Sequence, residues 1–247
     1  MMESTQTRLS TGKKVNSALD DPINFFAAQG HTQRASDLAM RKDEMSEAIQ
    51  TIKAADNGIS AITDMIASAK SLAQSALASN NTTERATLSG QYDTMMTQIS
   101  ELRDDSGYKG TNLLDATQSI TVSFDESGDS TLAVAGTDGT GALNGTTATT
   151  NWAADADITG DIALLDTARD SLRTSSKTLS NQLSTITTRQ EFTSKMINTL
   201  EDGAATLVNA DLNEEGANML MLQTRQSLGT TSLSLASQAA QSVMRLF

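Results

Sequence analysis

Apolar residues recur at alternating spacings of three and four along residues 45–76, and no proline interrupts them. This spacing places apolar side chains on one stripe of a helix, and it is sustained for about five heptads, so it predicts a coiled-coil seam. Asp21-Pro22 is the expected start of this helix, because aspartate caps free N–H groups and proline is tolerated at the first helical position. The seam residues are Met45, Ala48, Ile52, Ala55, Ile59, Ile62, Ile66, Ala69, Ala73 and Ala76.

Two further stretches repeat the helical spacing. The first is a shorter helix, which Thr82 or Thr83 is expected to cap and which should end at residues 105–107. The second is a long helix from about residue 158 to residue 207, in which four polar residues interrupt the apolar grid; such positions lower stability but fix the register. The shorter seam is Leu88, Tyr92, Met95, Ile99 and Leu102. The longer grid is Ile162, Leu165, Leu172, Leu179, Leu183, Ile186, Ile197, Leu200, Ala204 and Leu207, with Arg169, Ser176, Gln190 and Thr193 as the interruptions.

Between these helices the period changes to two. Residues 119–124 alternate polar and apolar side chains, residues 125–129 have turn composition, and residues 131–135 alternate again, so a β-hairpin is predicted. Residues 136–151 are rich in Gly, Thr, Asn and Ala and predict a surface loop, followed by Trp152 as a packing anchor. The expected fold is mainly α: a long antiparallel coiled-coil-like helical rod with a small β-hairpin region and a C-terminal helix.

Composition narrows the class of protein. Only 38% of the residues are hydrophobic and 3% are aromatic, which suits thin helical seams better than a thick core. The chain has no cysteine, so disulfides and thiolate metal sites are excluded. A net charge of −12 argues against nucleic-acid binding, and no apolar run is long enough to predict a membrane-spanning helix.

No catalytic constellation emerges from the residues, so we expect neither an enzyme nor a cofactor or metal site. His31 is the single histidine and is expected on the surface or in packing. Three carboxylate pairs are expected to cap helices and to face solvent. These pairs are Asp20-Asp21, Asp104-Asp105 and Glu214-Glu215.

The two ends of the chain carry distinctive motifs. Arg-Leu-Ser-Thr-Gly begins at Arg8, and the chain finishes on Ser-Val-Met-Arg-Leu-Phe. Residues 219–222 are four consecutive apolar residues, which favours a helix that packs against neighbours in an assembly, or against a chaperone before assembly, over one simply buried against the rod. Both ends resemble bacterial flagellin, the subunit of the flagellar filament. The matching N-terminal positions are Arg8, Leu9, Ser10, Gly12, Asn16, Asp20 and Asp21.

The resemblance implies a structural subunit that polymerises through its terminal helices and rod domain to form the motility propeller. It implies other flagellin subunits as homopolymer partners, an export chaperone at the C-terminal helix, and hook-associated and cap proteins. It also implies secretion into an extracellular filament. Because the N-terminus shows no basic-then-apolar signal peptide, this secretion needs an export machine that does not cleave one. The residues expected to pack the terminal helix are Leu220, Leu222, Leu233, Leu235, Val243, Met244, Leu246 and Phe247.

The expected segments follow from the same resemblance. They are residues 1–21 as a remnant of the N-terminal segment, 22–115 as the N-terminal rod helices, 116–157 as hairpin and variable surface region, 158–208 as the C-terminal rod helix, and 209–247 as the filament-core helix. Only Met1–Thr7 precede the N-terminal motif, where the family has most of an amphipathic helix. We therefore expect this chain alone to be a soluble monomer that does not form filaments, with a mobile final helix.

Two alternatives remain open. A hook–filament junction protein would have similar termini and a similar rod, although the C-terminal ending looks more like flagellin. A non-flagellar secreted coiled-coil protein would explain the heptads but not the two end motifs.

Many flagellins are detected by a Toll-like receptor through a rod motif that resembles Gln-Arg-Val-Arg-Glu-Leu-Ala-Val. Aligning the shared Leu-Ala places residues 67–74 at this position, and the motif is degenerate there. Ser68 and Lys70 stand for the two arginines, Ser71 stands for the glutamate, and Leu72 is kept. Losing planar, five-donor guanidinium groups predicts weak receptor activation.

Overall fold

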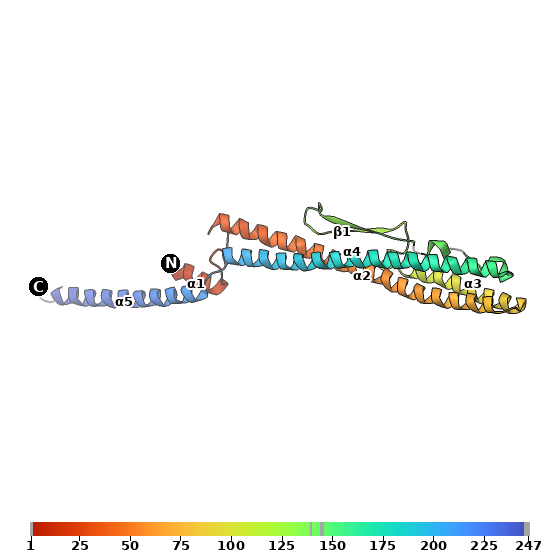
Figure 1. The fold of residues 1–247 in the computed structure, drawn as a ribbon. Coiled ribbons are helices and arrows are strands. Elements are labelled where there is room, and N and C mark those ends of the chain that lie inside the picture. The colour runs from red at the N-terminus through yellow and green to blue at the C-terminus, as the bar shows by residue number, and fades with distance from the viewer. Residues whose placement is uncertain (1, 139, 144–145, 245–247) are drawn as a thin grey trace. The chain divides into compact units, whose positions relative to one another are not determined.

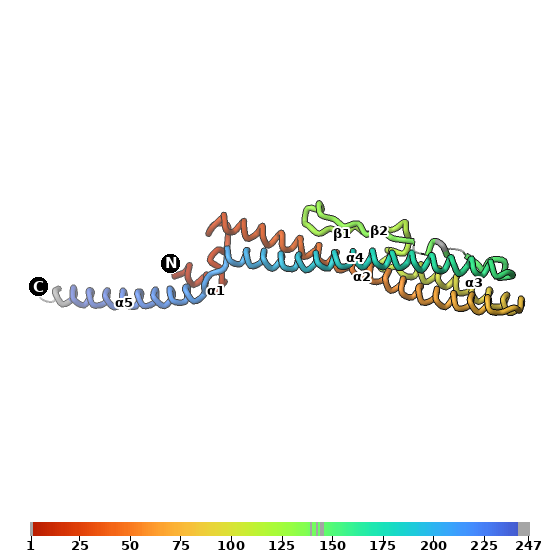
Figure 2. Tube along the Cα trace, viewed as in Figure 1, coloured from red at the N-terminus to blue at the C-terminus, as the bar shows by residue number. Residues whose placement is uncertain are grey.

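The computed structural model describes residues 2–138, 140–143 and 146–244, without the side chains of residue 142 and residues 242–244. Two compact units divide the chain, one made of Met1–Ser36 with Met196–Phe247 and the other of Asp37–Lys195. Figures 1 and 2 trace the chain through its helices and strands. The elements are the helices α1 (Met2–Thr11), α2 (Pro22–Ala78), α3 (Thr82–Asp105), α4 (Asp155–Val208) and α5 (Leu212–Met244), the strands β1 (Ser119–Ser123) and β2 (Thr131–Ala135), and the 3-10 helices η1 (Gly141–Leu143) and η2 (Thr149–Trp152). This confirms the mainly α fold with a small hairpin and a C-terminal helix.

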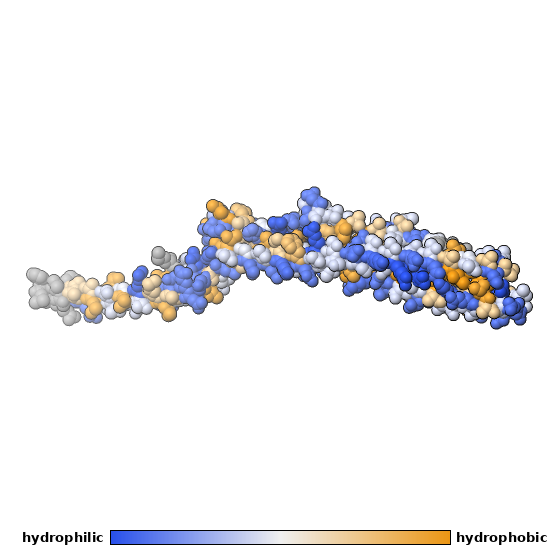
Figure 3. Space-filling view, viewed as in Figure 1, coloured by the Kyte–Doolittle hydropathy of each residue, from blue (hydrophilic) through white to orange (hydrophobic). Residues whose placement is uncertain are grey.

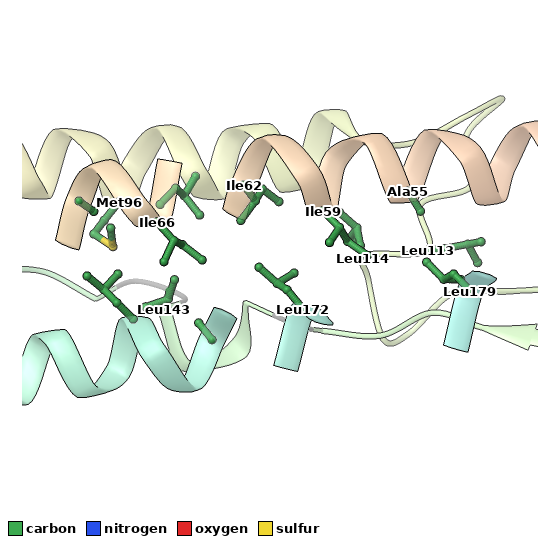
Figure 4. Close-up of a cluster of buried hydrophobic side chains, with 14 of the residues drawn as sticks. Ala55, Ile59, Ile62, Ile66, Met96, Leu113, Leu114, Leu143, Leu172 and Leu179 are labelled. Atoms are coloured by element: carbon green, nitrogen blue, oxygen red, sulfur yellow. The ribbon is translucent and has the colours of Figure 1, made fainter. Parts of the chain in front are cut away.

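The core of the unit 37–195 is the apolar seam of α2. All ten predicted seam residues of this helix are buried. Figure 4 shows Ile59, Ile62 and Ile66 facing across to Leu172 on α4, with Leu114 filling the space between the helices. Burying apolar surface of this kind stabilises by about 25 cal/mol per Å², so the seam is the main source of stability in this unit.

Polar cross-links show that α2 and α4 run antiparallel. Gln190 Nε2 donates to Ser46 Oγ at 2.7 Å, and Ser176 Oγ hydrogen-bonds Asp56 Oδ1 at 2.9 Å. Farther along α2, Lys70 Nζ lies 2.7 Å from an oxygen of Asp166. Residue numbers rise along α2 while those of the partners fall along α4. Two of the predicted polar interruptions, at 176 and 190, therefore tie the helices together in one register.

Helix α3 begins at Thr82, so its cap lies one residue before the earlier of the two predicted capping residues. Asn81, rather than either threonine that follows it, is the N-cap, because its side-chain oxygen accepts a hydrogen bond from Thr83 N at 3.0 Å. Asparagine is among the preferred capping residues, so this is a local competition that sequence alone left open. Near the other end Met96 is fully packed in the seam, and the predicted Met95 is only partly buried.

The predicted hairpin is present, with β1 and β2 paired antiparallel and Ile120 opposite Val134. Val122, Phe124 and Val134 are buried in the same core as the α2 seam. The guanidinium of Arg189 lies 5.3 Å from the centre of the Phe124 ring, which adds a cation–π contact between the hairpin region and α4.

The loop that follows the hairpin is more packed than predicted. Residues 136–151 were expected on the surface, but Thr140, Leu143 and Ala148 are buried, and two 3-10 helices form between residues 141 and 152. Ala148 N donates to Asp93 Oδ1 on α3, which fastens the loop to that helix. Small residues with no apolar period gave no sign of this packing.

Trp152 is the anchor of this loop, as predicted. Its side chain is fully buried, its ring centre lies 5.0 Å from that of Tyr92, and its Nε1 donates to Asp161 Oδ2 at 2.7 Å. Asp161 also accepts hydrogen bonds from Thr149 N and Oγ1. Residues 150–152 all have positive φ angles, an uncommon backbone for side chains with a Cβ, so these bonds hold a strained turn.

Asp161→Ala tests this anchor. The change leaves the buried indole N–H unpaired, so we expect the free energy of unfolding to fall by about 2–4 kcal/mol. Trp152 is the single tryptophan and makes its fluorescence a direct reporter during urea unfolding. Asp129→Ala, on an exposed residue of the hairpin turn, is the control and should change stability by less than about 0.5 kcal/mol. Equal stability of the two variants would contradict the assigned role.

Two helical glycines should respond oppositely to alanine. A Cβ at Gly58 would stand 2.6 Å from Ser106 Cβ and 3.1 Å from Leu114 Cδ1, whereas a Cβ at Gly90 meets no atom within 4 Å. We expect Gly58→Ala to destabilise by about 1–3 kcal/mol through overpacking. Gly90→Ala should stabilise by about 0.5–1 kcal/mol through helix propensity. Chemical denaturation measures both, and a stabilising Gly58→Ala would show that the helices are not this close.

Candidate functional site

The two ends of the chain meet at a junction in the unit formed by residues 1–36 and 196–247. Gly12 ends α1 with φ +69°, and its carbonyl accepts a hydrogen bond from Ala210 N at 3.0 Å. Lys14 N and Val15 N both donate to Val208 O, at 2.7 and 3.3 Å. The predicted N-terminal motif is therefore bonded through its backbone to the turn between α4 and α5.

An ion pair fastens α1 to α5. Arg8 Nη1 lies 2.8 Å from Glu215 Oε1, and the side chain of Glu215 is only 10% exposed, against 42% for Arg8. Glu215 was expected to face solvent, and this expectation is wrong, because the first turns of α5 lie under α1. Removing one partner of a shielded pair leaves an unpaired carboxylate, which costs more than losing a surface pair.

Asp20 organises the loop between α1 and α2. Its Oδ2 accepts hydrogen bonds from Asn16 N at 3.0 Å and from Ser17 N at 2.9 Å. These backbone bonds favour the charged carboxylate, so they hold the pKa of Asp20 below its usual range. Because the folded pKa is lowered, this contribution to stability is present above about pH 4 and is lost as the pH falls through the lowered pKa.

Two aspartates begin the long helices of this unit. Asp21 Oδ1 accepts from Asn24 N at 3.1 Å, so it caps α2 as predicted. Asp211 Oδ1 accepts from Asn213 N at 2.8 Å and caps α5. Hydrogen bonds from Asn24 also lower the pKa of Asp21, so its negative charge, which suits a helix N-terminus, persists into mild acid. The remaining motif residues, Leu9 and Ser10, lie in α1 as half-buried and exposed positions.

Helix α5 is uncovered beyond its first turns. Every residue from 223 to 241 is exposed, and Leu220, Leu233 and Leu235 are 66%, 74% and 61% exposed. Figure 3 shows hydrophobic side chains at the surface of this helix. Leu222 is half-buried. The other residues predicted to pack this helix, namely Val243, Met244, Leu246 and Phe247, have side chains outside the described part of the structure.

Sequence reasoning singled out Met221 only as part of the apolar run 219–222, and it missed Leu228. Met221 and Leu228 are 46% and 62% exposed, and with Leu235 they stand at seven-residue intervals. A seven-residue interval keeps side chains on nearly one face of a helix. The sequence contains this interval, but leucines on other faces of the helix, such as Leu220 and Leu233, made it hard to recognise.

Comparison with known proteins identifies the family. The profile of the bacterial flagellin N-terminal helical region matches residues 1–119. Flagellin FljM of Caulobacter vibrioides is 30% identical over 244 residues, which cover 98% of this chain and 89% of FljM. The chain belongs to the bacterial flagellin family.

Other flagellins agree over the same length. Flagellin FljK of Caulobacter vibrioides is 29% identical, covering all of this chain and 90% of FljK, and a flagellin of Brucella melitensis is 26% identical, covering all of this chain and 91% of that protein. The crystal structure of Bacillus cereus flagellin superposes with a TM-score of 0.54 at 20% identity, covering 61% of this chain and 88% of that one. At that identity the structural likeness supports the fold alone.

Family membership gives this flagellin a structural role in the extracellular flagellar filament, rather than an enzymatic one. The junction protein and the non-flagellar secreted protein are not favoured. None of the described helices is both long and apolar enough to cross a membrane.

Arg8→Ala should detach α1 from α5. The change leaves Glu215 shielded and unpaired, so we expect local opening of residues 2–11 to become easier by about 1–3 kcal/mol. Hydrogen exchange of the α1 amides, read by mass spectrometry, measures this loss of protection. Arg225→Ala, on an exposed position of α5, is the control and should leave α1 unchanged. Unchanged protection of the α1 amides in Arg8→Ala would show that the ion pair does not hold α1 on α5.

Proposed function

We propose that this flagellin polymerises with other subunits through α5 and through the helical unit 37–195. The observation that carries the proposal is the uncovered α5, in a chain whose relatives are flagellins over their whole matched length. An isolated helix with leucines on several faces is only marginally stable in water, and burial of these leucines against a neighbouring subunit stabilises it.

The distribution of charge supports association through this helix. Residues 226–244 carry no charged side chain. Subunits with a net charge of −12 repel each other, and an uncharged segment lets them meet without burying carboxylates. Earlier polar residues of α5, such as Glu214 and Glu215, lie near the junction and stay outside this segment.

Other partners follow from the same surface. Before assembly, the exposed leucines of α5 and Met221 offer an export chaperone an adaptable apolar helix. Hook-associated and cap proteins would meet the subunit at the two ends of the growing filament. The five segments expected from the sequence, from residues 1–21 to residues 209–247, are proposed as its working parts.

The degenerate receptor position predicts weak detection by the host. Ser68 Oγ donates to Asp64 O within α2, and both oxygens of Asp166 lie within 2.8 Å of Lys70 Nζ. Lys70 keeps the one positive charge that remains of the motif, and this charge is paired with Asp166 on α4. Leu72 is half-buried and Ser71 is exposed but has no charge to offer a partner.

Immunogold labelling tests the filament role. The chain is expressed in a motile bacterium that keeps one flagellin of its own, and an antibody against residues 116–157 is applied to isolated flagella. We expect label along the whole filament. Label restricted to the hook end would indicate a junction protein, and unlabelled flagella with secreted chain in the medium would indicate a non-flagellar protein. Either result would overturn the proposal.

A receptor-reporter assay tests the host prediction. The unmodified chain should give a response at least about tenfold below that of a flagellin with the full motif, because charge-assisted bonds at an interface centre contribute on the order of 2–5 kcal/mol. Ser68→Arg with Ser71→Glu should raise the response. A matched pair of changes on exposed positions outside the motif, Ser75→Arg with Ala78→Glu, should not. A full response from the unmodified chain would refute the prediction.

A further inference from the structure

An apolar groove of about 430 Å³ lies where the start of α2 runs beside the end of α4, in the unit formed by residues 1–36 and 196–247. The apolar residues that line it are Val15, Phe25, Ala28, Ala204, Ala205 and Val208. Three of these six are alanines, and small residues in a contact surface let a second helix approach closely. One basic and one acidic residue, Lys13 and Glu201, also line the groove, so it carries little net charge.

The same chain offers a helix surface that suits this groove. Met221, Leu228 and Leu235 form a stripe along one face of α5, which we call the α5 stripe. All three residues are 46–62% exposed, so the described part of the chain leaves the α5 stripe open to a partner. The groove and the α5 stripe thus lie in one unit, but they do not cover each other.

Charge favours a contact between two copies through their units 1–36 and 196–247 over a contact through their units 37–195. Residues 1–36 and 196–247 carry six basic and eight acidic residues, a net charge of −2. Residues 37–195 carry twelve basic and twenty-two acidic residues, a net charge of −10. Two copies therefore repel least where their terminal units meet.

We propose that the groove of one subunit receives the α5 stripe of a second copy of this chain. The proposal rests on the filament role above and names the surfaces that would serve it. Because groove and stripe are different surfaces, the contact is heterologous, and a head-to-tail contact that does not close into a ring propagates as an open helix. Each subunit then contributes one groove and one stripe, which is what a growing filament end requires.

A second exposed apolar patch, at the start of α2, is the alternative surface on which the α5 stripe could pack. Leu19, Ile23 and Phe26 are 97%, 81% and 61% exposed. Ala27 is exposed and lies four residues after Ile23, on the same face of α2, whereas Gln29 is exposed and lines the groove. Cross-linking from positions 27 and 29 therefore distinguishes the two surfaces.

Cysteine cross-linking inside filaments tests the proposal, because the natural chain has no cysteine. Subunits with Gln29→Cys and subunits with Ser232→Cys are co-expressed in the motile bacterium that keeps one flagellin of its own, and the isolated filaments are treated with a short bismaleimide. Position 232 flanks the α5 stripe, and Ser237→Cys lies on the opposite face as its matched control. We expect dimers that join positions 29 and 232 at about tenfold the yield with Ser237→Cys, because thiols that face apart are not joined.

Each outcome decides between the surfaces. Dimers that join position 232 to Ala27→Cys but not to Gln29→Cys would place the stripe on the alternative surface and overturn the proposal. Dimers joining two copies of position 232 alone would show stripe packing on stripe and would also overturn it. Filaments without any of these cross-links would refute the groove contact while leaving the filament role standing. Absence of this chain from filaments would reject both.

A pair of charge variants gives an independent measure. Leu228→Asp with Leu235→Asp places two carboxylates in the α5 stripe, and Thr230→Asp with Ser237→Asp places them on the opposite face. Both pairs add the same charge to an exposed helix, so folding of the monomer is a shared control. We expect the stripe pair to lower the amount of chain in filaments by about tenfold relative to the control pair. Equal incorporation of the two would contradict a buried stripe.

Discussion

The register between α2 and α4 is the constraint on which the unit 37–195 depends. Isoleucine and alanine bury the seam of α2, but a continuous apolar stripe would tolerate several alignments of its partner. Hydrogen bonds from Gln190 to Ser46 and from Ser176 to Asp56 are satisfied in one alignment only. The hairpin and the loop after it pack into the same core, so their positions follow from this alignment.

The sequence predicted the elements that have a repeating apolar pattern, and it missed features that depend on single contacts between distant residues. The seams, the hairpin and the buried Trp152 followed from period and composition, because burial on one helix face leaves a regular trace. The buried state of Glu215 did not, since it depends on Arg8, a partner 207 residues away in the chain. The packed loop 136–151 was missed for a similar reason: Asp93 and Asp161, on two different helices, hold its backbone.

The junction shows how family motifs become geometry. Gly12 supplies a left-handed backbone at the end of α1, Asp20 gathers the N–H groups of Asn16 and Ser17, and Asp21 starts α2. None of these residues carries out chemistry. Together they turn the chain through a short loop in which Lys14 N and Val15 N donate to Val208 O, so that the end of α1 and the start of α5 lie at one place.

The length of α2 has a mechanical consequence. Its 57 residues span about 85 Å at 1.5 Å per residue, and between Ser46 and Lys70 it is joined to α4 by side-chain bonds spaced along that length. A force that slides one helix along the other is shared among these bonds instead of falling on one of them. Such a pair resists shear while it remains free to bend. Those properties suit a structural subunit of a filament.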